Sequence, residues 1–484
     1  MILIHRWLGV GLCLFFVLWF LSGIGMMYWE FPDVGPADRL AHASALDPDA
    51  VRLTPAEAFA KTRLSEPVTN ASLAVFDGRP AYRFRSGRRD ATVYADSGEV
   101  RGDITQEMML RVATAWTGQA AGPVTVESID DVDQWTIQVR GLKPLWKYAW
   151  ASGEHVYVSQ ASGEVVQYTT TASRLGAYLG PIPHWLYFTP LRKHAPLWST
   201  LVIWLSGLGT GTAILGIIIG ISVFSPGRRY RIAGVPVRIP YAGAKRWHAV
   251  LGLIFGLAAA TWAFSGMLSM GPFFWQGAGG SRLGADALSR RLRGSVRVAD
   301  FDTRSPREAL QLVGVKVREL ELVEVAETPF YIASAGLQNT RIVPLDGPPE
   351  PAFNQRLLQD AVTSSGGSVA LREFGLIYQY DRYYLDRRRA LPLPVFRVRL
   401  DDPARTHYYI DATTARVVGS YSSRDWVTRW AYHGLHSLDF PWLYNHRPLW
   451  DIVVITFMLG GAALSVTSVI LAWRVLGMRI RGLL

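Results

Sequence analysis

The sequence predicts a membrane protein in which a bundle of four α-helices carries α+β domains on one side of the bilayer. Three observations support this fold class: four long apolar stretches, a basic segment between the second and third stretches, and a repeat that relates the two halves of the 484-residue chain. An internal repeat of this length fixes the plan of a protein before any local feature does. We therefore expect two pseudo-symmetric halves, related by an axis along the membrane normal.

The four apolar stretches are long enough to cross a membrane. Each contains at least about 20 mainly apolar residues without Asp, Glu, Lys or Arg, which can span a hydrocarbon core of roughly 30 Å as a helix. Bulky residues (Met26, Met27 and Tyr28) follow the first stretch where a signal peptide would be cleaved, so we expect an uncleaved anchor. Tryptophans near the ends fit interfacial belts: Trp7, Trp29, Trp198, Trp247, Trp450 and Trp473.

Charge sets the expected orientation. The segment between the second and third stretches has six basic residues and no acidic one: Arg228, Arg229, Arg231, Arg238, Lys245 and Arg246. Short loops rich in Lys and Arg stay in the cytoplasm, so the linker and both termini should be cytoplasmic and the long segments periplasmic. The net charge of +11 comes partly from these loops, so we expect no nucleic-acid partner.

The expected organisation follows from these stretches. It comprises transmembrane helices at 1–29, 197–224, 248–271 and 450–473, periplasmic domains at 30–196 and 272–449, a cytoplasmic linker at 225–247 and a cytoplasmic tail at 474–484.

Local patterns predict small α+β modules, about two per half, each with one helix on an antiparallel sheet. Residues 54–64 open with a Thr-Pro pair and a Glu three residues after the Thr, which indicates a helix start. Residues 79–86 and 91–100 alternate around a turn and predict a hairpin. Strands are also expected at 134–141 and 377–385.

The repeat places histidines at matching positions. Two alignments without gaps relate the halves: 5–27 with 248–270, and 183–198 with 435–450. They match six of the ten histidines: His5 with His248 (the inner pair), His184 with His436 (the outer pair), and His194 with His446. Two imidazoles on opposite helices can supply both axial ligands of a haem iron in a bundle core. One pair on each side of the membrane suits two haems.

A structural explanation of these histidines stays open, because an interfacial histidine often serves as an anchor and a duplication copies structural residues too. The outer pair lies in apolar, aromatic surroundings, whereas His194 and His446 stand beside basic residues, so the outer pair is preferred as ligands and His194 and His446 are the second choice. Basic residues near the pairs are candidates to bind haem propionates: Arg6, Arg192, Lys245, Arg246 and Arg447.

The chain resembles the PepSY-associated transmembrane proteins over nearly its whole length. The resemblance lies in HRWLGV at the start of the first span, in the strand ends SGEVV and DATTARVVG, and in GLHSL before the last span. In the second half the corresponding motif reads KRWHAV, so the histidine follows the Arg-Trp pair instead of preceding it. The family includes inner-membrane reductases of ferric siderophores that hold two b-type haems. The resemblance thus implies a location in the bacterial inner membrane, PepSY-like periplasmic domains, and His5, His248, His184 and His436 as ligands of the haem iron.

The expected function is transmembrane electron transfer to a ferric chelate, with haem ligation as the site chemistry and no further catalytic residue. No GxGxxG follows a strand, so the electron donor should be a quinol or another membrane protein. Two alternatives remain: a PepSY scaffold or sensor without catalysis, and a divalent-metal transporter that uses the histidine pairs. Aromatic residues of the outer segments could shape a chelate site or simply fill the modules: Trp146, Tyr148, Trp150, Tyr378, Tyr380, Tyr383 and Tyr384.

Overall fold

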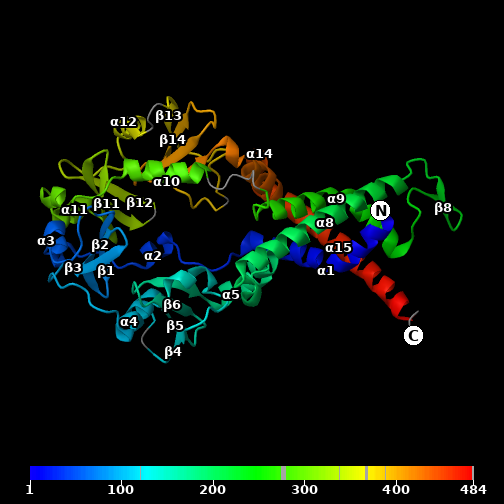
Figure 1. The fold of residues 1–484 in the computed structure, drawn as a ribbon, viewed down its shortest axis with the longest axis horizontal. Helices are drawn as coiled ribbons and strands as arrows, with labels where there is room; N and C mark the ends of the chain where they lie inside the picture. The colour runs from blue at the N-terminus through cyan, green and yellow to red at the C-terminus, as the bar shows by residue number, and fades with distance from the viewer. Residues whose placement is uncertain (120–121, 274–279, 337, 366–368, 387, 482–484) are drawn as a thin grey trace.

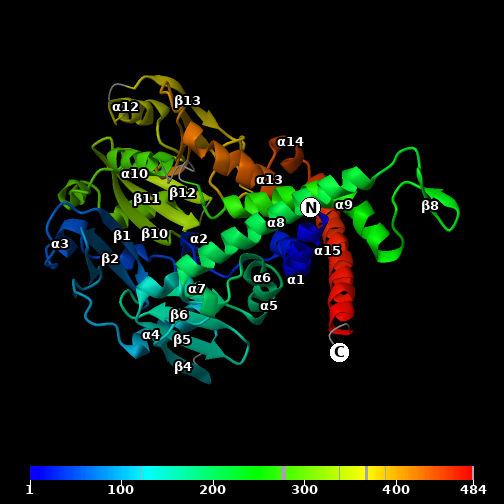
Figure 2. The ribbon, with the colours of Figure 1, turned by 45° about the vertical axis from the view of Figure 1, so that its right-hand side comes forward.

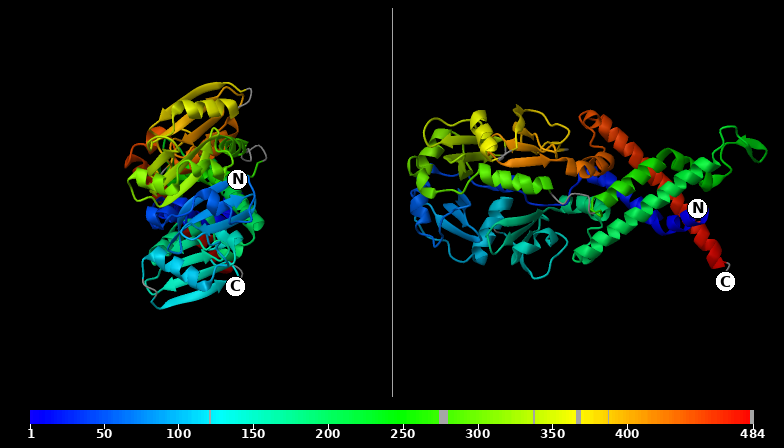
Figure 3. Two further views of the ribbon diagram at one scale, coloured as in Figure 1. Left: turned by 90° about the vertical axis from the view of Figure 1, so that its left-hand side faces the viewer. Right: turned by 45° about the horizontal axis from the view of Figure 1, so that its top comes forward.

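The computed structural model describes residues 1–119, 122–273, 280–336, 338–365, 369–386 and 388–481. Figure 1 shows two parts, a bundle of long helices and a body of β-sheets beside one end of it. Both termini lie at the bundle, and the N-terminus is at the end away from the sheets (Figures 1 and 2). A short hairpin of β8 and β9 lies beyond this same end, as the right panel of Figure 3 also shows.

Four helices are long and apolar enough to cross a membrane, by length and composition. They are α1 (Ile2–Tyr28), α8 (Ala195–Val223), α9 (Gly243–Leu268) and α15 (Leu449–Arg481). Helix α9 begins five residues before the expected start at 248, because Ala, Lys and Arg are good helix formers and extend it into the basic linker. For the same reason α15 continues into the expected tail, of which 482–484 lie outside the described residues. The linker itself contains β8 (Tyr230–Ile232) and β9 (Val235–Val237).

Close packing in the bundle depends on a glycine pair of α15. Helix α15 contacts both α1 and α9, and α8 also contacts both of these helices. A β-carbon on Gly460 would lie 2.3 Å from Phe255 Cε1, and one on Gly461 would lie 2.3 Å from Phe20 Cε1. The absent side chains therefore leave room for aromatic rings of α9 and α1, as small residues do at helix interfaces in membranes.

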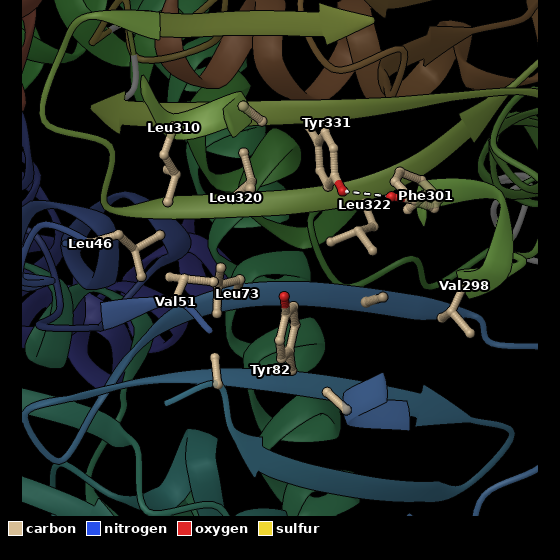
Figure 4. Close-up of a cluster of buried hydrophobic side chains, with 14 of the residues drawn as sticks. Leu46, Val51, Leu73, Tyr82, Val298, Phe301, Leu310, Leu320, Leu322 and Tyr331 are labelled. Carbon is tan, nitrogen blue, oxygen red and sulfur yellow. Dashed lines mark hydrogen bonds between the residues drawn. The ribbon is translucent and has the colours of Figure 1, made fainter. Parts of the chain in front are cut away.

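The two outer segments share one six-stranded antiparallel sheet in the order β12-β11-β10-β1-β2-β3. Its strands are β1 (Asn70–Phe76), β2 (Arg79–Ser86), β3 (Arg89–Tyr94), β10 (Glu319–Val325), β11 (Thr328–Gly336) and β12 (Asn339–Pro344). Strands β1 and β10 join the halves, with Ala71 opposite Leu322. Leu73, Tyr82 and Tyr331 are buried in the core that covers this junction (Figure 4). The outer segments are therefore one folded body.

Two four-stranded antiparallel sheets lie on either side of the six-stranded sheet (Figure 3, left). Their strands are β4 (Val124–Ile129), β5 (Leu145–Trp150), β6 (His155–Ser159) and β7 (Val165–Thr169), and then β13 (Leu371–Ile377), β14 (Val395–Leu400), β15 (His407–Asp411) and β16 (Val417–Tyr421). The helices of this body are α2 (Pro36–His42), α3 (Pro55–Phe59), α4 (Gln106–Thr117), α10 (Gly280–Leu292), α11 (Pro306–Val313) and α12 (Gln355–Ser365), with 3₁₀ turns at Pro48–Ala50, Val298–Asp302 and Ser423–Asp425. The predicted α+β character is thus confirmed, as are the helix start at Thr54 and the hairpin of β2 and β3.

Two strand predictions are wrong. Residues 134–141 form a turn and part of a 3₁₀ helix (Ile137–Leu142), and of 377–385 only the first residue belongs to a strand. In both places an aspartate reorganises the backbone. Asp133 accepts hydrogen bonds from the N–H groups of the second and third residues after it, and Asp381 does the same. Such side-chain contacts to the local backbone compete with ladder pairing, and alternation of residue types does not show them.

Candidate functional site

The inner pair lies inside the bundle. His5 of α1 and His248 of α9 face each other with ring centroids 6.1 Å apart and planes inclined by 43°. The carbonyl oxygen of Thr212 on α8 lies 3.0 Å from His5 Nδ1, and Thr467 Oγ1 on α15 lies 3.1 Å from His248 Nδ1. All four long helices therefore contribute to this site.

The outer pair lies where the bundle meets the sheets. It is carried by short helices that precede the second and fourth long helices: α5 (Thr171–Leu179), α6 (Pro181–Trp185) and α7 (Thr189–Arg192), and then a π-helical turn (Val427–Gly434), α13 (Leu435–Ser437) and α14 (Pro441–Tyr444). His184 of α6 and His436 of α13 have ring centroids 5.9 Å apart and planes inclined by 63°. The sequence repeat thus identified two pairs of histidines that the fold brings together.

Matched contacts hold the outer pair against the long helices. Ser22 Oγ and the Trp19 carbonyl each lie 3.2 Å from His184 Nδ1, and Ser265 Oγ lies 3.0 Å from His436 Nδ1. Ser22 and Ser265 occupy equivalent positions in the repeat. The sequence showed this equivalence, but the role of the serines becomes visible only when α6 packs on α1 and α13 packs on α9.

Two tryptophans fix the residue that follows each outer histidine. Trp198 Nε1 donates to the Trp185 carbonyl at 2.8 Å, and Trp450 Nε1 donates to the Ser437 carbonyl at 3.0 Å. At Gly25 a β-carbon would lie 2.5 Å from the Leu179 carbonyl oxygen, so α1 and the end of α5 meet backbone to backbone. The two tryptophans, expected as interfacial anchors, therefore also position the outer pair.

The hydrogen bonds of the Nδ1 atoms show which ring nitrogen of each histidine could bind a metal. The partners of His5 and His184 include carbonyl oxygens, which only accept. The hydroxyls of Ser265 and Thr467 donate their own protons to backbone carbonyls, so their oxygens accept from the imidazoles. Each Nδ1 therefore carries a proton. Within the described residues no hydrogen bond reaches any of these Nε2 atoms, which carry the lone pair in the neutral imidazole. A hydrogen bond from the other ring nitrogen is the usual way to orient a metal-binding histidine.

The distance between the rings matches two imidazoles on one metal ion. A metal–imidazole bond is about 2.0 Å and the ring nitrogen lies about 1.2 Å from the ring centre, so two axial imidazoles should have centroids roughly 6.4 Å apart. The observed values of 6.1 and 5.9 Å are close to this value. The described residues contain no group of three or more His, Cys, Asp or Glu side chains that could hold a metal. Two protein ligands alone suit a metal whose other ligands come from a macrocycle.

A cavity of about 260 Å³ adjoins the outer pair and has mainly apolar walls. Phe20, Trp198 and Trp262 line it together with both histidines. The guanidinium of Arg192 lies 4.4 Å from the ring centre of Trp198, and its buried Nε has no hydrogen-bond partner within the described residues. A cation with an unused donor beside an aromatic cavity fits a flat cofactor that bears carboxylates, such as haem.

The remaining predicted residues lie elsewhere. His194 and His446 are exposed, His446 Nδ1 lies 2.6 Å from the Trp442 carbonyl, and no ring contact joins the two in the described part of the chain. Arg447 pairs with Asp451 and stacks on Trp450. Arg6, Lys245 and Arg246 are exposed near the inner pair's helix ends. The structure therefore brings together the preferred outer pair and not the second choice.

The inner and outer pairs are at opposite ends of the bundle. Ser22 and Ser265 each follow the histidine of their own helix by 17 residues, which corresponds to about 26 Å at the rise of an α-helix. Aromatic rings occupy the space between the pairs. The ring centroid of Trp262 lies 6.0 Å from that of Phe20 and 6.4 Å from that of Phe457.

These features define a class of protein: a polytopic membrane protein with a histidine pair near each end of its helix bundle. A family model described as the PepSY-associated TM region matches residues 2–474. The chain belongs to this family, as the resemblance of its motifs indicated. A comparison with curated proteins found no match.

Proposed function

We propose that the protein is a b-type haem reductase that moves electrons across the bacterial inner membrane to a ferric siderophore or another ferric chelate in the periplasm. In this proposal the two halves are related by a pseudo-twofold axis, the termini are cytoplasmic and the sheets are periplasmic. The basic residues of the linker and of the C-terminal end support this orientation.

The observation that carries the proposal is the geometry of the two pairs. Each has two imidazoles whose Nδ1 atoms are hydrogen-bonded to oxygens and whose ring centroids are about 6 Å apart. A structural anchor would need neither the facing partner nor the matched hydroxyls. We infer that the inner pair and the outer pair each bind one haem, through His5 and His248 and through His184 and His436.

Haem iron would supply one-electron transfer at each site. The residues of the chain hold, orient and shield the cofactor. Ser22, Ser265 and Thr467 accept the Nδ1 protons, which makes Nε2 a better donor to iron, and the aromatic walls exclude water. A quinol that delivers two electrons and releases two protons would match two ferric ions reduced to ferrous, and the ferrous product binds oxygen chelators weakly.

The test is electron transfer in sealed vesicles that contain the purified protein. The reductant is enclosed inside, and a ferric chelate with a chromogenic ferrous chelator is outside. We expect coloured ferrous complex to form with the parent protein and to be lost in His5→Ala and in His436→Ala. His446→Ala is the matched control and should keep the parent rate, because this exposed side chain is not part of either pair.

Equal rates in all these variants would contradict the proposal. A PepSY scaffold or sensor would be the remaining explanation if the vesicles showed no reduction at all. A metal transporter would instead carry divalent ions across the vesicle membrane without any reductant.

A further inference from the structure

A second, larger cavity lies within the sheet body, and none of the paired histidines lines it. Its volume is about 940 Å³, which is within the range of pockets that hold small ligands of several hundred daltons. Its walls come from the edge of the six-stranded sheet around Arg341, from Tyr378–Tyr380 after β13, from Arg389–Pro394 before β14, and from the turn after β15.

The walls of this cavity favour an anion. Arg341 and Arg389 line it, and neither guanidinium forms an ion pair with a carboxylate within the described residues. Asp411 also lines the cavity, but it is only 7% exposed, and its two oxygens accept hydrogen bonds from Thr413 and Thr414. Arg341 Nη1 donates to the Thr340 carbonyl at 3.0 Å, which leaves its other N–H groups available. Arginine matches oxygen anions in geometry as well as charge.

The wall is held in place before any ligand binds. Tyr380 donates to the Leu391 carbonyl at 2.8 Å, and Tyr384 donates to the Pro392 carbonyl at 2.9 Å. Asp386 accepts from the backbone N–H of Leu391 at 2.8 Å. Tyr378, at 70% exposed, presents its ring at the same wall. A fixed wall with an accessible aromatic ring lowers the ordering cost of binding.

The segment that forms this wall also reaches the outer pair. Leu385 packs in one cluster with Met27, Leu438 and Met458. Met458 lines the cavity of the outer pair, and Leu438 follows His436 by two residues. Arg388 forms an ion pair with Glu30, just beyond the end of α1. The segment that lines the larger cavity therefore also contacts residues next to the outer pair.

We propose that the 940 Å³ cavity binds the electron acceptor, a ferric chelate of net negative charge with catecholate or carboxylate oxygens, through Arg341 and Arg389. Its role as an acceptor site rests on the proposed function, whereas the binding itself does not. The chelate occupies a fixed pocket of the sheet body and does not enter the membrane.

Binding is tested without electron transfer, by calorimetric titration of the purified full-length protein with a gallium(III) tricatecholate. Gallium(III) copies the size and charge of ferric iron but is not reduced. We expect saturable binding that weakens with salt. Arg341→Gln and Arg389→Gln should each raise the dissociation constant by about tenfold.

Arg356→Gln is the matched control, since it removes the same charge from an exposed position on α12 outside the cavity. Its dissociation constant should stay within about twofold of the parent. A neutral gallium trihydroxamate should bind more weakly than the anionic complex. Circular dichroism of each variant confirms that the sheets are intact.

Two outcomes would overturn the inference: the parent binds no gallium tricatecholate, or both cavity variants bind it as tightly as the parent. A failure of the proposed reductase function would give a different result. In that case the protein would lack haem, yet it would still bind the gallium complex through the two arginines.

Discussion

The hydroxyl of Ser265 provides a sharp test of how the outer pair is oriented. Ser265→Ala removes the oxygen that lies 3.0 Å from His436 Nδ1. The N–H of the imidazole then loses this acceptor in an apolar cavity, which costs about 1–3 kcal/mol, or roughly 5- to 150-fold in a binding constant. Loss of an outer-shell partner at metal sites typically weakens metal binding by about 10- to 100-fold, which lies within this range.

The assay is haem titration into protein produced without haem, followed by the absorbance of the bound cofactor. We expect Ser265→Ala to weaken the outer site by about 10- to 100-fold and to leave the inner site unchanged. Ser222→Ala is the control, because within the described residues this exposed hydroxyl bonds only to the Ile218 carbonyl of its own helix. Parent affinity at both sites in Ser265→Ala would refute the assigned orientation of His436.

Three further predictions concern packing and pH. Gly461→Val should lower the free energy of unfolding by about 1–3 kcal/mol, because the valine side chain would collide with Phe20. Thermal melts in detergent measure this loss. Gly477→Val is the control, because the space around Gly477 is open. Leu73→Ala should lower the free energy of unfolding by about 2–5 kcal/mol in denaturant, since Leu73 is fully buried at the joined sheet. An unchanged midpoint at an unchanged m-value would contradict this. Burial and two nearby cations lower the pKa of His155 to about 4 in the folded state. In the unfolded state this histidine binds a proton below about pH 6.5, whereas the folded state binds it only near pH 4. The free energy of unfolding, and with it the melting temperature, should therefore fall from pH 6.5 towards pH 4. His155→Gln should make this fall in melting temperature smaller.

The sequence predicted which histidines come together better than it predicted the outer fold. The inner and outer pairs follow from two constant offsets, because a duplicated chain returns each histidine to an equivalent helix. The supporting residues were harder to recognise. Ser22 and Ser265 are matched in the repeat, but a serine in a helix usually bonds to its own backbone, and only the packing of α6 and α13 brings the histidines to them.

The junction of the sheets could not be predicted from local patterns. Strands β1 and β10 are about 250 residues apart, and the alternation of a strand does not identify its partner. A further match could have been found, since the offset of 252 also pairs His155 with His407. Both residues begin the third strand of their sheets, and each has a buried Nδ1 without a hydrogen-bond partner in the described residues.

The haem content of the purified protein tests the central claim most directly. The reduced spectrum and a pyridine haemochrome assay, on protein expressed with ample haem, should give two b-type haems per chain. His5→Ala and His436→Ala should each retain one haem, and His446→Ala should retain both. A colourless parent protein, or a haem count that falls in His446→Ala but not in His436→Ala, would contradict the assignment of the two pairs.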